Sequence, residues 1–180
     1  MLKLNNSKKL LEKSKELIPG LTQTFSRAAP SFVEGIYPVY AQKANGSHFW
    51  DVDGNNFLDY LMGLGPITLG YNYKSVNDSV IAQLNEGVLF SLPHPIELEL
   101  SELLCKTIPN AEMVKFEKSG SNAVTGAVRA ARAITKRDKI AYCGSAGVWH
   151  DWQAIMVSRN EGVPEFNRQL IKLFDYNDIE

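Results

Sequence analysis

The sequence lacks several patterns that place a protein in a common functional class. Its 180 residues include two cysteines, Cys105 and Cys143, which are far apart and form no CxxC motif, so neither a disulfide framework nor a redox pair is indicated. Lysine and arginine nearly balance aspartate and glutamate, and the net charge of −1 excludes the basic field of a nucleic-acid-binding or membrane-binding surface. No apolar run approaches the length of a membrane span.

Motifs for other chemistries are also missing. His48, His94 and His150 are scattered without ligand spacing, so we expect no metal site. Neither a G-x-G-x-x-G dinucleotide loop nor a G-x-S-x-G nucleophile elbow occurs. The first residues have no apolar core followed by small residues, as a signal peptide would, and we expect a cytoplasmic protein. The hydrophobic fraction of 44% and the charged fraction of 22% are ordinary for a globular chain.

The most informative stretch is residues 112–137, which predicts a strand, a turn and a helix. Met113, Val114 and Phe116 suit a buried strand, and small apolar residues recur at helical spacing from Ala123 onward. Between them, residues 118–122 form the turn, where Ser119 or Ser121 can cap the helix. The unpaired N–H groups of such a helix end can hold a phosphate, although a cap without any ligand explains the same residues.

The rest of the chain alternates helical and strand-like segments around strong turn signals. Pro19-Gly20 ends a first helix near Ile18, and an irregular arm follows over 21–31. The Asn-Gly and Asp-Gly pairs predict the hairpins of a β-meander over 37–60. Further predicted elements are helices over 74–86 and from 95 to 109, with core-facing Val76, Val80, Ile81, Leu84, Ile96, Leu100, Leu103 and Leu104, and parallel strands over 139–143 and 170–174.

Motifs spread over the whole chain resemble those of the class III aminotransferases, pyridoxal 5′-phosphate (PLP) enzymes of fold type I. Within that family the sequence is most similar to the glutamate-1-semialdehyde 2,1-aminomutase branch. The resemblance depends on the order and spacing of Pro19-Gly20 with Thr24 and Arg27, Trp50-Asp51-Val52-Asp53-Gly54, Leu58-Asp59-Tyr60, Gly65-Pro66 with Leu69-Gly70, Ser119-Gly120-Ser121, and Arg129-Ala130-Ala131-Arg132-Ala133.

The resemblance implies an α/β chain that forms the N-terminal part of a fold type I enzyme. We expect a helix and substrate arm over 1–35, a β-meander and Gly/Pro-rich segment over 36–72, and the beginning of a PLP-binding large domain over 73–180. The cofactor phosphate would lie at Gly120, Ser121 and Asn122, and the arm would bring Thr24 and Arg27 to a substrate carboxylate. Family members are homodimers that act on small amino substrates.

The sequence departs from the family pattern in the residues that surround cofactor and substrate. Leu64 stands where the aminomutase has an aromatic residue, Ser145 where homologues have a Tyr that stacks on the cofactor, and Asn122 where they have an acid. None of the lysines lies in the motif of the Schiff-base lysine, so no catalytic residue is assigned. We therefore expect a chain that is inactive alone and needs the C-terminal portion of such an enzyme.

Three hypotheses follow from these residues. The first is the N-terminal portion of a PLP-dependent aminotransferase or aminomutase acting on a carboxylate- or sugar-type substrate. The second is a degenerate, non-catalytic subunit that pairs with an intact homologue, as the replaced tyrosine and acid suggest. The third is an independent α/β domain that binds another phosphorylated ligand at residues 119–121.

Overall fold

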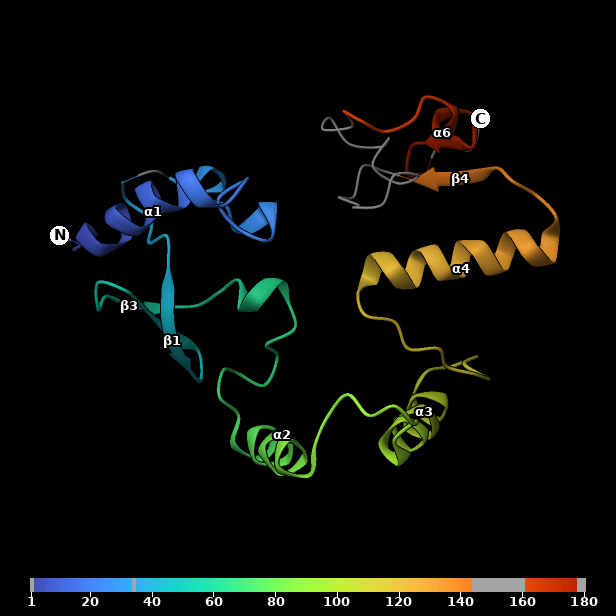
Figure 1. Cartoon of the computed structure of the whole chain (residues 1–180), viewed down its shortest axis with the longest axis horizontal. Coiled ribbons are helices and arrows are strands. Elements are labelled where there is room, and N and C mark those ends of the chain that lie inside the picture. Colours follow the sequence, from blue (N-terminus) through green and yellow to red (C-terminus); the bar gives the residue numbers. More distant parts are fainter. Residues whose placement is uncertain (1, 34, 144–160, 178–180) are drawn as a thin grey trace. The chain divides into compact units, whose positions relative to one another are not determined.

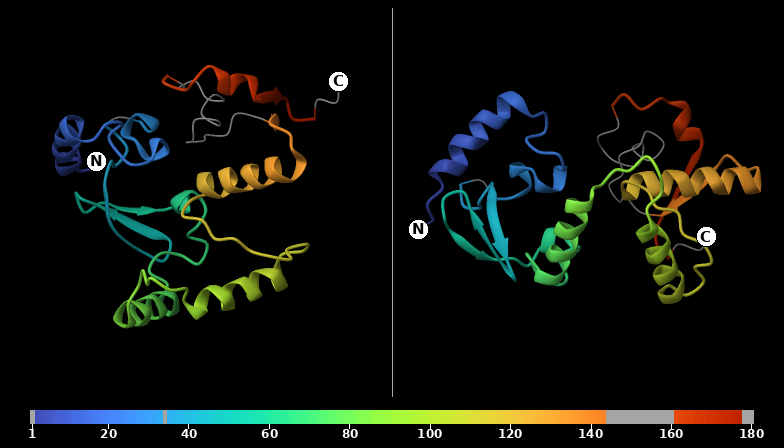
Figure 2. Two further views of the ribbon diagram at one scale, coloured as in Figure 1. Left: turned by 45° about the vertical axis from the view of Figure 1, so that its right-hand side comes forward. Right: turned by 60° about the horizontal axis from the view of Figure 1, so that its bottom comes forward.

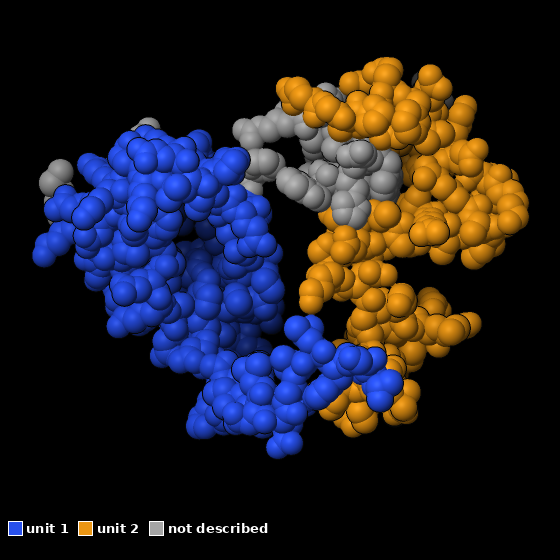
Figure 3. All heavy atoms as spheres, in the orientation of Figure 1, with its two compact units in different colours: residues 1–92 blue, residues 93–180 orange. Residues whose placement is uncertain are grey.

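A computed structural model of the chain describes residues 2–33, 35–143 and 161–177 (Figure 1). The chain forms two units, Met1–Leu92 and Pro93–Glu180, which are coloured separately in Figure 3. The predicted division into 1–35, 36–72 and 73–180 stays a prediction. Helices, an antiparallel meander and a parallel strand pair are all present, as expected for an α/β fragment of a fold type I enzyme.

Unit 1 begins with helix α1, Asn5–Leu17, which is amphipathic. Leu4 and Leu11 are buried on one face of this segment, whereas Leu17 is 65% exposed. The helix ends at Ile18, whose amide donates to the carbonyl of Ser14, directly before the Pro19-Gly20 breaker. The predicted helix end near Ile18 is thus confirmed.

The segment after α1 contains two single 3₁₀ turns, η1 over Phe25–Arg27 and η2 over Ala29–Ser31. The Phe32 and Tyr37 rings stack after these turns, with their centroids 4.2 Å apart. The irregular arm predicted over 21–31 is confirmed.

An antiparallel meander follows, with strands β1 (Ala41–Asn45), β2 (His48–Asp51) and β3 (Asn56–Leu58) in the order β1-β2-β3 (Figure 2). Gly46 and Gly54 take φ values of +55° and +82° in the two turns, the conformation for which the Asn-Gly and Asp-Gly pairs are suited. The rings of Phe49 and Phe57 stack across β2 and β3 at 5.0 Å. The predicted hairpins are therefore confirmed.

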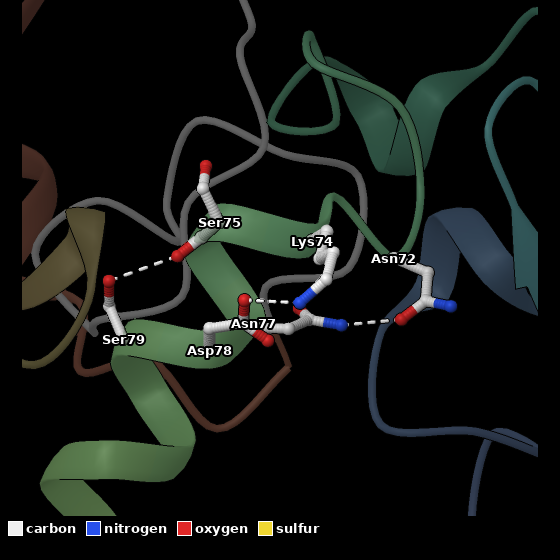
Figure 4. Close-up of polar contacts among 6 residues, drawn as sticks. All are labelled: Asn72, Lys74, Ser75, Asn77, Asp78 and Ser79. Atoms are coloured by element: carbon white, nitrogen blue, oxygen red, sulfur yellow. Dashed lines mark hydrogen bonds and ion pairs between the residues drawn. The ribbon is translucent and has the colours of Figure 1, made fainter.

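A Gly/Pro-rich loop with the short turn η3 (Met62–Leu64) leads to helix α2, Lys74–Glu86. Figure 4 shows the polar contacts that secure the start of α2: Lys74 pairs with Asp78 at 2.6 Å, and Asn77 donates to Asn72. The helix ends at Gly87, as predicted.

Unit 2 contains helices α3 (Pro95–Thr107), α4 (Gly120–Thr135) and α6 (Phe166–Gln169). Strands β4 (Ile140–Cys143) and β5 (Ile171–Phe174) pair in parallel, with Ile140 opposite Ile171 and Cys143 opposite Phe174. The parallel strand pair predicted over 139–143 and 170–174 is confirmed.

One predicted strand does not form. Residues 113–116 were expected as a buried strand, but they have no strand assignment, and the Met113 side chain is 92% exposed. A strand exists only when a neighbour accepts and donates its backbone hydrogen bonds, and none of the described strands pairs with this segment. The following helix also begins earlier than expected, at Gly120 instead of Ala123.

The described residues enclose very little core. Apart from Pro38, the buried apolar residues are Leu4, Leu11 and Ala28. The side chains expected to face the core from α2 and α3 are largely exposed, at 44–59% for Val76, Val80, Ile81, Leu84, Ile96, Leu100 and Leu103. None of the described helices is long and apolar enough to cross a lipid bilayer.

Candidate functional site

The N-terminus of α4 in unit 2 is shaped by Ser119. Its backbone is extended (φ −150°, ψ 164°), and its hydroxyl accepts a hydrogen bond from the amide of Asn122 at 3.3 Å. Of the two serines predicted as possible caps, Ser119 and Ser121, the structure uses Ser119, so its hydroxyl is committed to the helix. Gly120, Ser121 and Asn122 then form the first helical turn.

Gly120 leaves the helix end open. A Cβ added at this position would meet no atom within 4 Å. Among the described residues, the amides of Gly120 and Ser121 have no protein acceptor, as is usual for the first turn of a helix. Unpaired amides at the positive end of a 16-residue helix, with a free approach over a glycine, fit a phosphate group.

Asn122 contributes an amide where an acid was expected from the family pattern. The first turn of α4 carries no acidic residue at all. A helix start without a carboxylate is electrostatically better suited to a phosphate dianion than one that carries an acid. The amide cannot supply the negative charge of an Asp or Glu to any group beside it.

Thr24 and Arg27 come together in unit 1. The amide of Arg27 donates to the carbonyl of Thr24 at 2.9 Å and closes the 3₁₀ turn η1. Positions three apart eclipse one another in such a turn, which places these two residues on one side of the arm. The structure thus brings the two predicted substrate residues into one turn, and it brings the three predicted cofactor residues into another.

Arg27 lines a cavity of about 290 Å³ between α1 and the arm, together with Lys8, Glu12 and Tyr37. Among the described residues, the guanidinium has no carboxylate partner, whereas Glu12 is paired with Lys15 at 2.7 Å. An exposed guanidinium with free donors at a cavity is a suitable receptor for an external carboxylate.

The side-chain pair Asp59–Tyr71 was not identified from the sequence. The Tyr71 hydroxyl donates to Asp59 Oδ2 at 2.6 Å, and this hydrogen bond, with burial, raises the pKa of Tyr71 to about 12. Burial raises the pKa of Asp59, but the bonds from Tyr71 and from the amides of Leu61 and Met62 outweigh it and hold that pKa below its ordinary value. In the sequence, Asp59 stands out only as part of the Leu58-Asp59-Tyr60 motif. That motif does not indicate that Tyr71 is its hydrogen-bond partner.

The comparison with known proteins settles the family. The model of the class III aminotransferase family matches residues 32–168. The chain belongs to the class III aminotransferase family. Over 99% of its length it is 39% identical to a 3-aminobutyryl-CoA aminotransferase of Cloacimonas acidaminovorans, and over 97% it is 31% identical to a glutamate-1-semialdehyde 2,1-aminomutase of Saccharolobus islandicus.

The fold comparison agrees. A solved structure described as a transaminase with PLP bound superposes on 99% of this class III aminotransferase chain, with a TM-score of 0.86 and 27% identity. The chain spans about two fifths of its relatives, namely 42% of each of the two curated proteins and 43% of that structure. The cofactor of the family is pyridoxal 5′-phosphate, and the open start of α4 fits its phosphate.

Ser145, which stands where homologues have a tyrosine that stacks on the cofactor, lies outside the described residues.

Proposed function

We propose that this class III aminotransferase chain forms part of a PLP-dependent enzyme that moves an amino group on a small substrate carrying a carboxylate or sugar. PLP, when bound, supplies a carbonyl group that takes up an amine and a ring that accepts electrons. In this proposal Gly120, Ser121 and Asn122 hold the phosphate, and Thr24 and Arg27 bind the substrate carboxylate. The observation that supports this proposal is the start of α4, which is open at Gly120 and has no acidic residue in its first turn.

We also propose that the chain is inactive alone and works with the remaining portion of such an enzyme, in a cytoplasmic homodimer. Two separate globular units of half this mass would together expose about 10,500 Å². The chain instead exposes 14678 Å². Its exposed surface includes Ile134 of α4, at 81%, and Leu103 of α3, at 59%. Apolar surface of this extent marks an association face.

Complementation tests the proposal. The chain and a polypeptide equivalent to the remaining three fifths of a class III aminotransferase would be co-expressed and purified together. We expect cofactor absorbance and amino-group transfer in the complex and neither in the chain alone. A stable complex that retains no PLP would contradict the assigned phosphate site. Cofactor-dependent transfer by the chain alone would contradict the need for a second portion.

The absence of an acid from the first turn of α4 favours one alternative, a non-catalytic subunit that pairs with an intact homologue. This alternative would be supported if the chain co-purifies with a full-length homologue and the amount of PLP bound per homologue chain does not change when this chain is present. An increase in bound PLP that follows the amount of this chain would favour the catalytic role.

A further inference from the structure

The cavity between α1 and the arm, called the α1 cavity from here on, has an apolar floor. Leu4 and Leu11 line it from the α1 segment, and each is only 8% exposed. Pro38, which is also buried, lines it from the segment before β1, and Ala29 lines it from η2. Because these side chains carry no hydrogen-bonding group, an apolar molecule that displaces water from them is stabilised by the hydrophobic effect.

The size and the walls of the α1 cavity suit an aromatic ring with a short chain. Its volume is about 290 Å³. A dry protein cavity of about 150 Å³ takes up benzene, so the α1 cavity has room for a ring and several further atoms. The rings of Phe32 and Tyr37 both line it and stack on each other, with their planes 4° from parallel. They provide aromatic surface for such a ligand.

The charged residues of the α1 cavity carry an excess of positive charge. Lys8 of α1 and Arg27 of η1 line it, and neither has an ion-pair partner among the described residues. Glu12, the one acid in the described lining, is paired with Lys15 at 2.7 Å. Lys8, Arg27 and Glu12 are exposed, whereas the floor is buried, so the charges lie on the solvent side. An anion with an apolar body matches this distribution.

We propose that the α1 cavity binds a small carboxylate with an apolar body, and that Lys8 and Arg27 share the negative charge. Of the buried residues in the described lining, only Ser7 carries a hydroxyl group, so the floor cannot replace the water that a sugar would lose. The contact with Arg27 rests on the proposed function, whereas the contacts with α1 do not. Two sources supply such a ligand, the substrate of amino-group transfer and a separate regulator.

The first test titrates the full chain with 3-phenylpropionate and follows the methyl groups of Leu4 and Leu11 by NMR. We expect saturable shifts, NOEs from these methyl groups to the phenyl ring, and a dissociation constant on the order of 1 mM or tighter. 3-Phenylpropanamide, which has the same body without the charge, should bind about fivefold more weakly. Gluconate, which has the charge and a hydroxylated body, should shift neither methyl group. Equal shifts with gluconate, or none with 3-phenylpropionate, would overturn the proposal.

Lys8→Met tests the charge that α1 contributes, since it keeps the length of the side chain. The variant should bind 3-phenylpropionate about threefold more weakly and 3-phenylpropanamide as the wild type does. Lys9→Met is the matched control, because Lys9 is the neighbouring exposed lysine of α1 and does not line the cavity. Equal affinities in the two variants would refute the role of Lys8.

Ala29→Leu tests the location of the apolar body, because the larger side chain fills part of the cavity from η2. Both phenyl probes should then bind more weakly by a similar factor. The unfolding transition of the variant shows whether it remains folded. A folded Ala29→Leu variant that binds both probes as the wild type does would place the ligand elsewhere and overturn the proposal.

These titrations fail or succeed separately from the proposed function, because they need neither PLP nor the remaining portion of the enzyme. If Lys8→Met weakens the binding of 3-phenylpropionate and Arg27→Met does not, the carboxylate contact of the proposed function is refuted and the site on α1 is supported. The opposite result refutes the part of α1 and supports that contact.

Kinetics of the complemented enzyme distinguish the two sources of the ligand. If 3-phenylpropionate raises the KM of the amino-group transfer at constant kcat, the result supports the site and identifies its ligand as the substrate. A change in kcat alone supports the site and identifies a regulator. Kinetics that do not respond, at concentrations that saturate the Leu4 and Leu11 shifts, would overturn a functional role for the α1 cavity.

Discussion

The backbone amide of Ser7 donates to Asp53 Oδ2 at 2.9 Å, so the turn between β2 and β3 caps helix α1 from 46 positions further along the chain. Oδ1 of the same carboxylate accepts from the amide of Asn6 at 2.7 Å. Asn55 adds a bond from its side chain to the carbonyl of Lys3, at 2.6 Å. The α1 segment has no side-chain cap of its own, and the meander supplies it instead.

Protonation of Asp53 at low pH should break the cap that it forms at the N-terminus of α1. Burial raises the pKa of Asp53, but the hydrogen bonds from Ser7 and Asn6 outweigh it, so the folded pKa lies below the ordinary value. The stabilisation is therefore complete above about pH 4 and is lost as the pH falls through the folded pKa. The Asn6 and Ser7 amide shifts should follow that titration between pH 6 and 2. Asp53→Asn should abolish it, and an identical titration in that variant would contradict the assignment.

Asp51 should contribute more to stability than any exposed acid. It is 1% exposed and accepts from the amides of Asp53 and Asn55, at 3.0 and 2.8 Å. Asp51→Ala leaves these partly buried donors without their acceptor and empties a buried site, and we expect a loss of about 2–3 kcal/mol in the free energy of unfolding by urea. Asp78→Ala, which removes an exposed pair with Lys74, should cost less than about 1 kcal/mol. Equal costs would contradict the role of burial.

Much of unit 1 could be predicted from the sequence because its turns depend on single residues. The contacts between residues far apart in the sequence could not be predicted. Gly46 and Gly54 mark the hairpins because positive φ is a property of a single residue, and Gly87 ends α2 for a similar local reason. The Asp53 cap joins residues 46 apart and the Asp59–Tyr71 pair residues 12 apart, with no periodic pattern to signal either.

The predictions that were wrong in unit 2 have another cause. The pattern of residues 113–116 suits a strand, and that of α3 suits a buried helix, but each needs neighbours that the described residues do not supply. At the candidate site, the Ser119 cap was predictable because the hydroxyl and its partner amide are three residues apart. The cavity beside Arg27 was not predictable, since residues of α1, of the arm and of the segment before β1 line it together.

Gly70 should be the least replaceable glycine of the 59–71 loop. Its φ is +86°, and an added Cβ would lie 3.1 Å from the carbonyl oxygen of Gly46, in the backbone bridge that anchors the loop. Gly70→Ala should cost at least about 1–2 kcal/mol in unfolding free energy. Gly126→Ala, inside α4 with its nearest contact at 3.7 Å, should stabilise by up to about 1 kcal/mol. A neutral Gly70→Ala would show that the bridge is dispensable.

Alkaline titration should single out Tyr71. Its bond to Asp59, with burial, raises its pKa to about 12, above the ordinary tyrosine value near 10. The protonated form is favoured in the folded chain, so its contribution to stability is complete below pH 10 and lost as the pH rises toward 12. In tyrosine-labelled NMR spectra the Tyr71 resonance should titrate last. Asp59→Asn should lower that pKa, and an unchanged value would contradict the pairing.

Replacing Gly120 should separate folding from cofactor binding. A methyl group here meets no protein atom within 4 Å, so Gly120→Ala should leave the free energy of unfolding unchanged or raise it by up to about 1 kcal/mol. If a phosphate docks on the amides of Gly120 and Ser121, the same methyl group lies on its path. PLP affinity of the complemented enzyme should then fall about tenfold or more.

Gly126→Ala is the matched control for this variant, because it makes the same change within α4 away from the open helix end. Retained affinity in Gly120→Ala, measured by equilibrium dialysis of PLP, would mean that the phosphate binds elsewhere. A parallel loss in both variants would indicate a change in the helix itself. A loss confined to Gly120→Ala, at unchanged stability, is expected only when the ligand occupies the space that the glycine leaves open.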